Sequence, residues 1–210
     1  GCHTKIAARY DPIARYAKHL ALELELIARS LGQPKQVSHV HWGGGTPTSL
    51  TSEDFARLMM RLRTQFVVSP NAEVAVEMDP RTLTRDMIET MAANGVTRAS
   101  LGIQDVDPDV QEAINRVQPL DLIRSAVSSL RDTGIRRISF DLMYGLPLQT
   151  DLSVRRTVDT VVSMDPDRLS VFGYAHVPWM KRHQRLIDMA NAADADGRMA
   201  QADAIADRLE

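Results

Sequence analysis

The sequence predicts an α/β fold in which parallel strands alternate with helices. Three observations lead to this prediction. Short apolar runs alternate with longer stretches of helical hydrophobic spacing. Capping residues, glycines or prolines stand at the ends of the helical stretches, and a glycine or polar cluster follows each apolar run. Such alternation indicates a parallel sheet flanked by helices, which either an open doubly wound sheet or part of a (β/α) barrel satisfies.

The first half of the chain shows clear helix signals. Asp11 suits an N-cap, Pro12 suits a first helical position, and Gly32 suits a helix end. Thr51 begins a second helix with a pattern similar to a capping box. In this half we expect helices at 13–31, 51–66 and 84–93 and strands at 37–42, 73–77 and 98–103.

The second half continues the same alternation. We expect helices at 108–115, 120–131 and 151–163, an alanine-rich helix at the end, and strands at 138–143 and 169–172. Four methionines at helical positions are expected in the core, namely Met59, Met60, Met87 and Met91. We treat residues 1–210 as one domain.

Composition excludes several classes of protein. The chain has 210 residues, 44% of them hydrophobic, and a formal net charge of -2, with no basic patch typical of a nucleic-acid-binding protein. It contains no run of about 20 apolar residues that would span a membrane. The single cysteine, Cys2, excludes an internal disulfide framework and fits a reducing, cytoplasmic location.

Polar residues gather where the predicted strands end. In parallel α/β folds ligands bind at the carboxyl ends of the strands. Each of five strands is followed by such a cluster: Gly43–Gly45 with Thr46, Glu77 with Asp79, Gln104 with Asp105, Asp141 with Tyr144 and Gly145, and Tyr174 with His176. Together they favour a large polar ligand with a carboxylate, an amine and ribose hydroxyls.

Each feature also has a structural explanation when taken alone. Glu77 and Asp141 could cap helices, Gln104 could satisfy backbone groups, and Arg116 could be a solvated charge at a helix end. His176 could be a hydrogen-bonded core histidine. The triple glycine is not followed by the Gly-Lys-Ser/Thr of a P-loop. Neither a nucleophile elbow nor a zinc spacing is present, so we predict no catalytic triad and no metal ligands.

Six segments together resemble the oxygen-independent coproporphyrinogen III oxidase family of radical S-adenosylmethionine (SAM) enzymes. These are HWGGGTPT at 41–48, VEMDP at 76–80, SLGIQD at 100–105, NR at 115–116, FDLMYGLP at 140–147 and DRLSVFGYAHVP at 167–178. The resemblance implies a partial (β/α) barrel of the TIM-like, radical SAM kind, with parallel strands lining the interior and helices outside.

The resemblance also implies a [4Fe–4S] cluster whose ligands are absent from this sequence. The family's motif is Cys-x-x-x-Cys-x-x-Cys-Gly-Cys, and Gly1-Cys2 is similar to its last two positions. Cys2 is then the non-ligating cysteine, and three ligands precede it. We therefore expect a fragment that lacks the first strand and the C-terminal part. Such a fragment is expected to be inactive, and unstable or oligomeric, whereas the intact protein is expected to be a monomer.

The implied reaction removes carbon dioxide and hydrogen from two propionates of coproporphyrinogen III to give protoporphyrinogen IX. A 5′-deoxyadenosyl radical made from SAM abstracts the hydrogen, an electron donor of unknown identity is needed, and no residue is assigned as general acid or base. The family binds two SAM molecules. By resemblance, Gly44 and Glu77 contact the cluster-bound one, and the second is lined by Gly45, Thr46, Gln104, Arg116, Asp141 and Ala175.

The nearest alternative is the haem-chaperone relative, which binds haem without oxidase activity. Two features favour the oxidase: Cys2 follows a glycine, and residues 174–178 are similar to the oxidase branch. A cluster-free α/β barrel is a more distant alternative, and three upstream cysteines would exclude it.

Overall fold

The computed structural model describes residues 7–209, which form two compact units. Unit 1 contains the chain up to Ser100 together with Ser128–Arg137, and unit 2 contains Leu101–Val127 and the chain from Ile138 onward. Cys2, which we placed at the end of a cysteine motif, lies outside the described residues.

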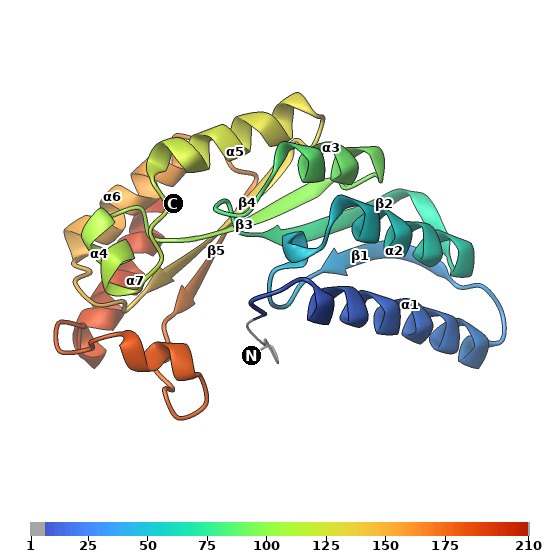
Figure 1. Ribbon diagram of the computed structural model, residues 1–210. Coiled ribbons are helices and arrows are strands. Elements are labelled where there is room, and N and C mark those ends of the chain that lie inside the picture. Colours follow the sequence, from blue (N-terminus) through green and yellow to red (C-terminus); the bar gives the residue numbers. More distant parts are fainter. Residues whose placement is uncertain (1–6, 210) are drawn as a thin grey trace. The chain divides into compact units, whose positions relative to one another are not determined.

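Five strands are present in the part of the chain that the structure describes. They are hydrogen-bonded in chain order, β1 to β5, and both the β1–β2 and the β4–β5 pairs are parallel (Figure 1). Their bounds are β1 Gln36–Trp42, β2 Val67–Met78, β3 Arg98–Gln104, β4 Arg137–Tyr144 and β5 Arg168–Gly173. The predicted α/β alternation and the five predicted strands are confirmed.

The helices between the strands also match the predicted ones. The α-helices are α1 Asp11–Leu31, α2 Ser52–Gln65, α3 Arg85–Ala93, α4 Pro108–Ala113, α5 Leu120–Asp132, α6 Asp151–Val162 and α7 Ala195–Leu209. Two short 3₁₀ helices, η1 Pro47–Ser49 and η2 Arg182–Leu186, were not predicted because single turns carry no periodic signal.

Local capping explains why the helices begin and end where they do. The side chain of Thr51 accepts a hydrogen bond from the Asp54 N–H, as the sequence predicts, and Gly32 ends α1 in a left-handed conformation with φ of 72°. Asp11 is not the N-cap of α1, contrary to the prediction. The helix begins at Asp11 itself, where a carboxylate in the first turn is stabilised by the helix dipole.

Strand β2 is longer than predicted. We expected it at 73–77, whereas it begins at Val67, because Val67 and Val68 already pair with β1. The register then shifts, and residues 69–72 of β2 lie across from Ser38 alone. Pro70 within this irregular stretch hides the strand in the sequence, because proline is rare inside a sheet.

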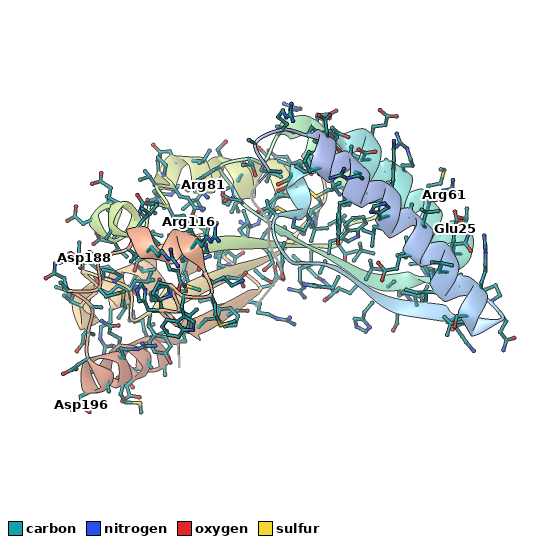
Figure 2. The ribbon with its side chains drawn as sticks, turned by 60° about the horizontal axis from the view of Figure 1, so that its bottom comes forward. Glu25, Arg61, Arg81, Arg116, Asp188 and Asp196 are labelled. Atoms are coloured by element: carbon teal, nitrogen blue, oxygen red, sulfur yellow. The ribbon has the colours of Figure 1, made fainter. Side chains whose placement is uncertain are left out.

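Unit 1 packs its helices over β1 and β2. Helix α2 contacts both α1 and α3, and its Phe55 and Met59 are buried together with Met91 of α3. Met60, which we expected in the core, is 56% exposed because it lies on the other side of α2. At the surface, Glu25 of α1 and Arg61 of α2 form an ion pair of 3.1 Å (Figure 2).

Unit 2 is built around the inward side chains of β4 and the helices that follow it. Phe140 and Leu142 of β4 are buried, as are Val158 of α6 and Ile205 of α7, and α6 contacts α7. Within residues 7–209 no helix is both long and apolar enough to cross a membrane.

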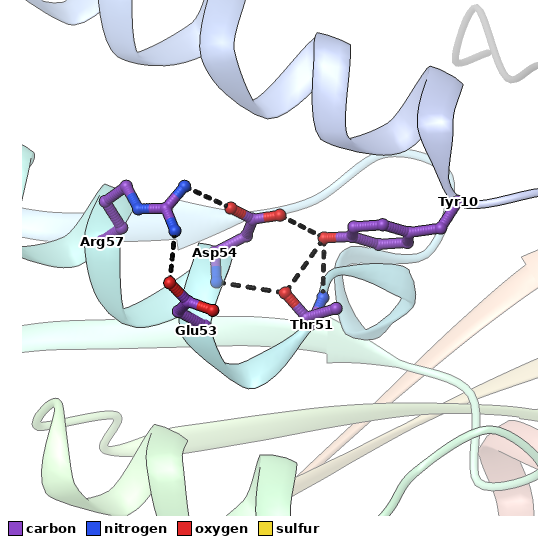
Figure 3. A network of polar contacts seen from close by, with 5 residues as sticks. All are labelled: Tyr10, Thr51, Glu53, Asp54 and Arg57. Atoms are coloured by element: carbon purple, nitrogen blue, oxygen red, sulfur yellow. Dashed lines mark hydrogen bonds and ion pairs between the residues drawn. The ribbon is translucent and has the colours of Figure 1, made fainter.

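Tyr10 connects the start of α1 to the start of α2 (Figure 3). Its hydroxyl accepts a hydrogen bond from the Thr51 N–H at 3.0 Å and donates one to the carboxylate of Asp54. Arg57 donates to the other oxygen of Asp54 at 2.8 Å and to Glu53 at 2.7 Å. One tyrosine hydroxyl therefore fixes the first turn of α2 from outside that helix.

We expect Tyr10→Phe to lower the free energy of unfolding of unit 1 by about 1–2 kcal/mol, because the Thr51 N–H and the buried carboxylate of Asp54 lose a partner. The measurement is the urea midpoint of the intact protein. Tyr16→Phe is the matched control, since Tyr16 is 65% exposed. Equal midpoints for the two variants would contradict a role for this contact.

Candidate functional site

The loop after β1 is shaped by three consecutive glycines. A Cβ on Gly43 would lie 2.7 Å from Nε2 of His41 and 2.8 Å from Oε1 of Glu77, so a side chain there would displace the ends of these two side chains. Gly44 and Gly45 both have left-handed backbones, with φ of 79° and 64°. The loop therefore turns sharply and brings its backbone against Glu77.

Glu77 of β2 is held by two contacts across the strand end. Its Oε2 accepts a hydrogen bond from the Gly44 N–H at 3.1 Å, and its Oε1 lies 3.0 Å from Nε2 of His41. The Glu77 side chain is 39% exposed, so the carboxylate is oriented but still accessible. Each carboxylate oxygen accepts more than one hydrogen bond, so Glu77 can also bind an amine.

Two buried polar atoms close to this loop in the sequence have no hydrogen-bond partner among the described residues. They are Nε1 of Trp42, whose ring lies 4.6 Å from that of Phe55 between centroids, and Oγ1 of Thr48. Buried polar atoms are normally paired, so atoms of this kind mark places that a water molecule or a polar ligand group completes. The loop of unit 1 thus fits a polar ligand.

In unit 2, Gln104 and Arg116 come together over Gly102. A Cβ on Gly102 would lie 3.0 Å from Nε2 of Gln104 and 3.3 Å from Nη2 of Arg116, so the missing side chain leaves room for both. Arg116 also donates to the Gly102 carbonyl at 2.9 Å (Figure 2 labels Arg116). Arg116 is therefore half-buried and fixed, which contradicts its reading as a solvated helix-end charge.

Gln104 has an unusual backbone. Its φ is 69°, and the Asp105 N–H donates to the Ile103 carbonyl at 2.9 Å across it, which closes a three-residue turn. Turns of this type with positive φ are rare and strained for residues other than glycine. The strained turn lies at Gln104, the last residue of β3.

Asp105 anchors this turn. Its side chain is fully buried and accepts hydrogen bonds from the Asp107 N–H at 2.8 Å, Nε2 of Gln149 at 2.5 Å and Oγ1 of Thr157 at 2.7 Å. Burial raises the pKa of the Asp105 carboxyl, and these three donors act in the opposite direction. Residues from two later elements thus hold the end of β3 in place.

The same network fixes the loop after β4. Gln149 donates to the Met143 carbonyl and accepts from the Leu146 N–H, both at 2.8 Å. Gln201 of α7 accepts from the Gly145 N–H at 2.9 Å and donates to the Gln149 carbonyl at 3.0 Å. The loops after β3 and β4 are therefore one hydrogen-bonded assembly.

The other predicted site residues lie on β4, after β5 and in the glycine loop before η1. Asp141 is half-buried on β4 and is paired in register with Ser170 of β5, and exposed Ala175 follows β5. Gly45 and Thr46 continue the glycine loop of unit 1 into η1. The structure brings Gly44 to Glu77 and Gln104 to Arg116. The supporting roles of His41, Asp105 and Gln149 were not predicted, because their contacts join residues far apart in the chain.

No group of three or more His, Cys, Asp or Glu side chains within residues 7–209 could hold a metal ion. The full sequence has one cysteine, whereas a [4Fe–4S] cluster of the predicted kind needs three thiolates. The residues present therefore do not fit such a cluster by themselves. The carboxylate of Glu77 in unit 1 is chemically suited to an amine, and the guanidinium of Arg116 in unit 2 is chemically suited to a carboxylate.

Comparison with known proteins gives the relationships of this chain. The profile of the Radical SAM superfamily matches residues 2–161. An oxygen-independent coproporphyrinogen III oxidase from Bradyrhizobium diazoefficiens is 51% identical over 210 residues, which are the whole chain and 47% of that protein. An uncharacterized protein from Sinorhizobium fredii is 47% identical over 95% of this chain and 76% of its own length.

The solved structure of coproporphyrinogen III oxidase from Escherichia coli, described as a radical SAM enzyme, matches with a TM-score of 0.90. It is 35% identical, and the match covers 97% of this chain and 46% of that one. The match confirms the predicted partial (β/α) barrel. The chain spans about half the length of these curated oxidases.

We expect Asp105→Ala to destabilise the fold by about 3 kcal/mol, because three buried donors lose their acceptor. Chemical denaturation of the intact protein measures this. Asp121→Ala is the control, since the Asp121 side chain is 98% exposed and on α5. A loss no larger than that of the control would show that Asp105 is not an anchor.

Proposed function

The chain belongs to the radical SAM superfamily, and from this premise we propose that the intact protein is an oxygen-independent coproporphyrinogen III oxidase. It would convert two propionates of coproporphyrinogen III to vinyl groups and so yield protoporphyrinogen IX for haem biosynthesis. Relatives that carry this name, at 35–51% identity, support the proposal. The single observation that carries it is the pairing of Gly44 with Glu77 at the end of β1.

Glu77 and Gly44 suit the methionine end of the first SAM molecule. The Gly44 N–H already donates to Glu77, so the carbonyl oxygen is the backbone group of Gly44 that we propose for the ligand. A carboxylate and a carbonyl are both acceptors, and the ammonium group of SAM offers three donors. We therefore assign the amine of the first SAM to these two residues.

A second SAM molecule is proposed to bind Gly45, Thr46, Gln104, Arg116, Asp141 and Ala175. The guanidinium of Arg116 suits its carboxylate, since arginine binds carboxylates with two parallel hydrogen bonds. The carboxylate of Asp141 suits a ribose hydroxyl or a cationic group. Gln104, held in its strained turn, offers both a donor and an acceptor beside Arg116.

A [4Fe–4S] cluster, whose ligands are not among these residues, would supply the electron chemistry, and Glu77 and Gly44 would hold the methionine end of SAM. The role of the residues described here is to bind and orient SAM, because in cofactor enzymes the protein contributes position and electrostatics. We assign no general acid or base to this chain. We further propose that residues 1–210 form one radical SAM barrel core, and that the intact protein is monomeric, cytoplasmic and served by an electron donor still to be identified.

The test is made on the intact protein, with its cluster assembled anaerobically, supplied with SAM, a reductant and coproporphyrinogen III. We expect protoporphyrinogen IX to form together with 5′-deoxyadenosine. A protein that assembles a cluster and binds haem but forms no product would instead be a haem-chaperone relative. Failure to assemble any cluster would overturn the assignment.

We expect Glu77→Gln to weaken SAM binding by about tenfold or more, because a hydrogen bond to a charged group contributes about 1.5–3 kcal/mol. Equilibrium binding of SAM to the cluster-loaded protein measures this loss without turnover. Glu89→Gln on α3 is the matched control, because the Glu89 side chain is 53% exposed and forms an ion pair with Arg85 of the same helix. Equal SAM affinity of the two variants would remove Glu77 from the site.

A further inference from the structure

The segment after β5 combines exposed apolar side chains with positive charge. Trp179 and Met180 are each 72% exposed, and Leu186 is 75% exposed. The cations lie among them in the sequence, and no acidic residue occurs from His176 to Ile187: the positive or titratable residues there are His176, Lys181, Arg182, His183 and Arg185. We call residues 176–187 the basic loop.

The basic loop is fixed to the end of β5. Gln184, which is only 8% exposed, accepts a hydrogen bond from the Val177 N–H at 2.6 Å and donates to the Ala175 carbonyl at 3.0 Å. Arg185 donates through Nε to the Pro178 carbonyl at 3.2 Å. Buried Gln184 therefore holds the backbone of the basic loop in one conformation, while Trp179 stays exposed on its surface.

The basic loop is hydrogen-bonded to Ala175, one of the proposed SAM residues of unit 2. Ala175, to which Gln184 is bonded, is one of the residues assigned to the second SAM molecule. The loop also follows a parallel strand at its carboxyl end, where ligands of such folds bind. A substrate bound to the basic loop would therefore lie close to Ala175, one of the residues assigned to the second SAM molecule.

We propose that the basic loop binds the reacting tetrapyrrole, with Trp179 and Met180 against its apolar ring system and Arg182 and Arg185 on propionate carboxylates. This inference rests on the proposed function and names the residues that recognise its substrate. The occupant must be both apolar and anionic. A purely apolar protein segment over the loop would bury the guanidinium groups without partners, which is strongly unfavourable.

The charges and the apolar side chains have separate effects that can be measured. Guanidinium–carboxylate contacts are charge-assisted and, at a partly exposed site, weaken with added salt. We expect the double variant Arg182→Gln/Arg185→Gln to bind coproporphyrin III at least tenfold more weakly and with a smaller salt dependence. Trp179→Ala is expected to weaken binding without changing the salt dependence.

The experiment uses the intact, cluster-loaded protein and two readouts. Calorimetric titration with coproporphyrin III, the oxidised form of the substrate, measures binding without turnover. Steady-state assays then separate the KM for coproporphyrinogen III, which should rise at least tenfold in the double variant, from SAM affinity, which should not change. Arg124→Gln on α5 is the control, since Arg124 is an exposed cation elsewhere in unit 2.

The failure of this inference and the failure of the proposed function give different results. If the wild-type protein forms protoporphyrinogen IX and the double variant keeps its coproporphyrin affinity and KM, the basic loop is not the substrate site. If the wild-type protein forms no product from coproporphyrinogen III and does not bind coproporphyrin III, the proposed function is wrong and the inference fails with it. Arg182→Lys, which keeps the charge, should retain most of the binding and so distinguishes loss of charge from misfolding.

Discussion

The buried carboxylate of Asp105 is the constraint on which the strand ends of unit 2 depend. It accepts three hydrogen bonds in a place without access to solvent, and removal of any donor leaves a buried acceptor less satisfied. These hydrogen bonds of Asp105 stabilise the neighbouring turn at Gln104, whose positive φ is unfavourable for a residue other than glycine. Through Gln149 the same carboxylate is coupled to the loop after β4, so the two strand ends keep a fixed geometry.

Most of the fold could be predicted from the sequence because its signals are local. Thr51 caps α2 and Gly32 ends α1 through contacts within four residues, and such contacts can be read from spacing. The early start of β2 could not be predicted in this way, since it depends on pairing with β1 across a register shift. The hydrogen bonds of Tyr10 to α2 were equally hidden, because they join residues more than 40 positions apart.

The candidate site shows the same division. Glu77, Gln104 and Asp141 could be proposed because a parallel fold gathers strand ends on one side, and the resemblance then assigned them to SAM. The groups that hold them could not be proposed. Gln149 and Thr157 lie 44 and 52 residues after Asp105, and nothing in a glutamine or a threonine marks it as the partner of a distant carboxylate. Supporting contacts of this kind are a property of packing and become visible only in the structure.

Gln184 is a second buried polar side chain that holds a loop of unit 2. Asp105 holds the end of β3, whereas Gln184 holds the segment after β5. Its amide oxygen and nitrogen bond the backbones of Val177 and Ala175, so one side chain sets the positions of the basic loop and of a residue assigned to SAM. Radical abstraction requires donor and acceptor atoms to be held at short, constant separation. If the loop carries the substrate, a single buried amide would fix that separation. A hydrophobic side chain of similar size could not form these two backbone hydrogen bonds.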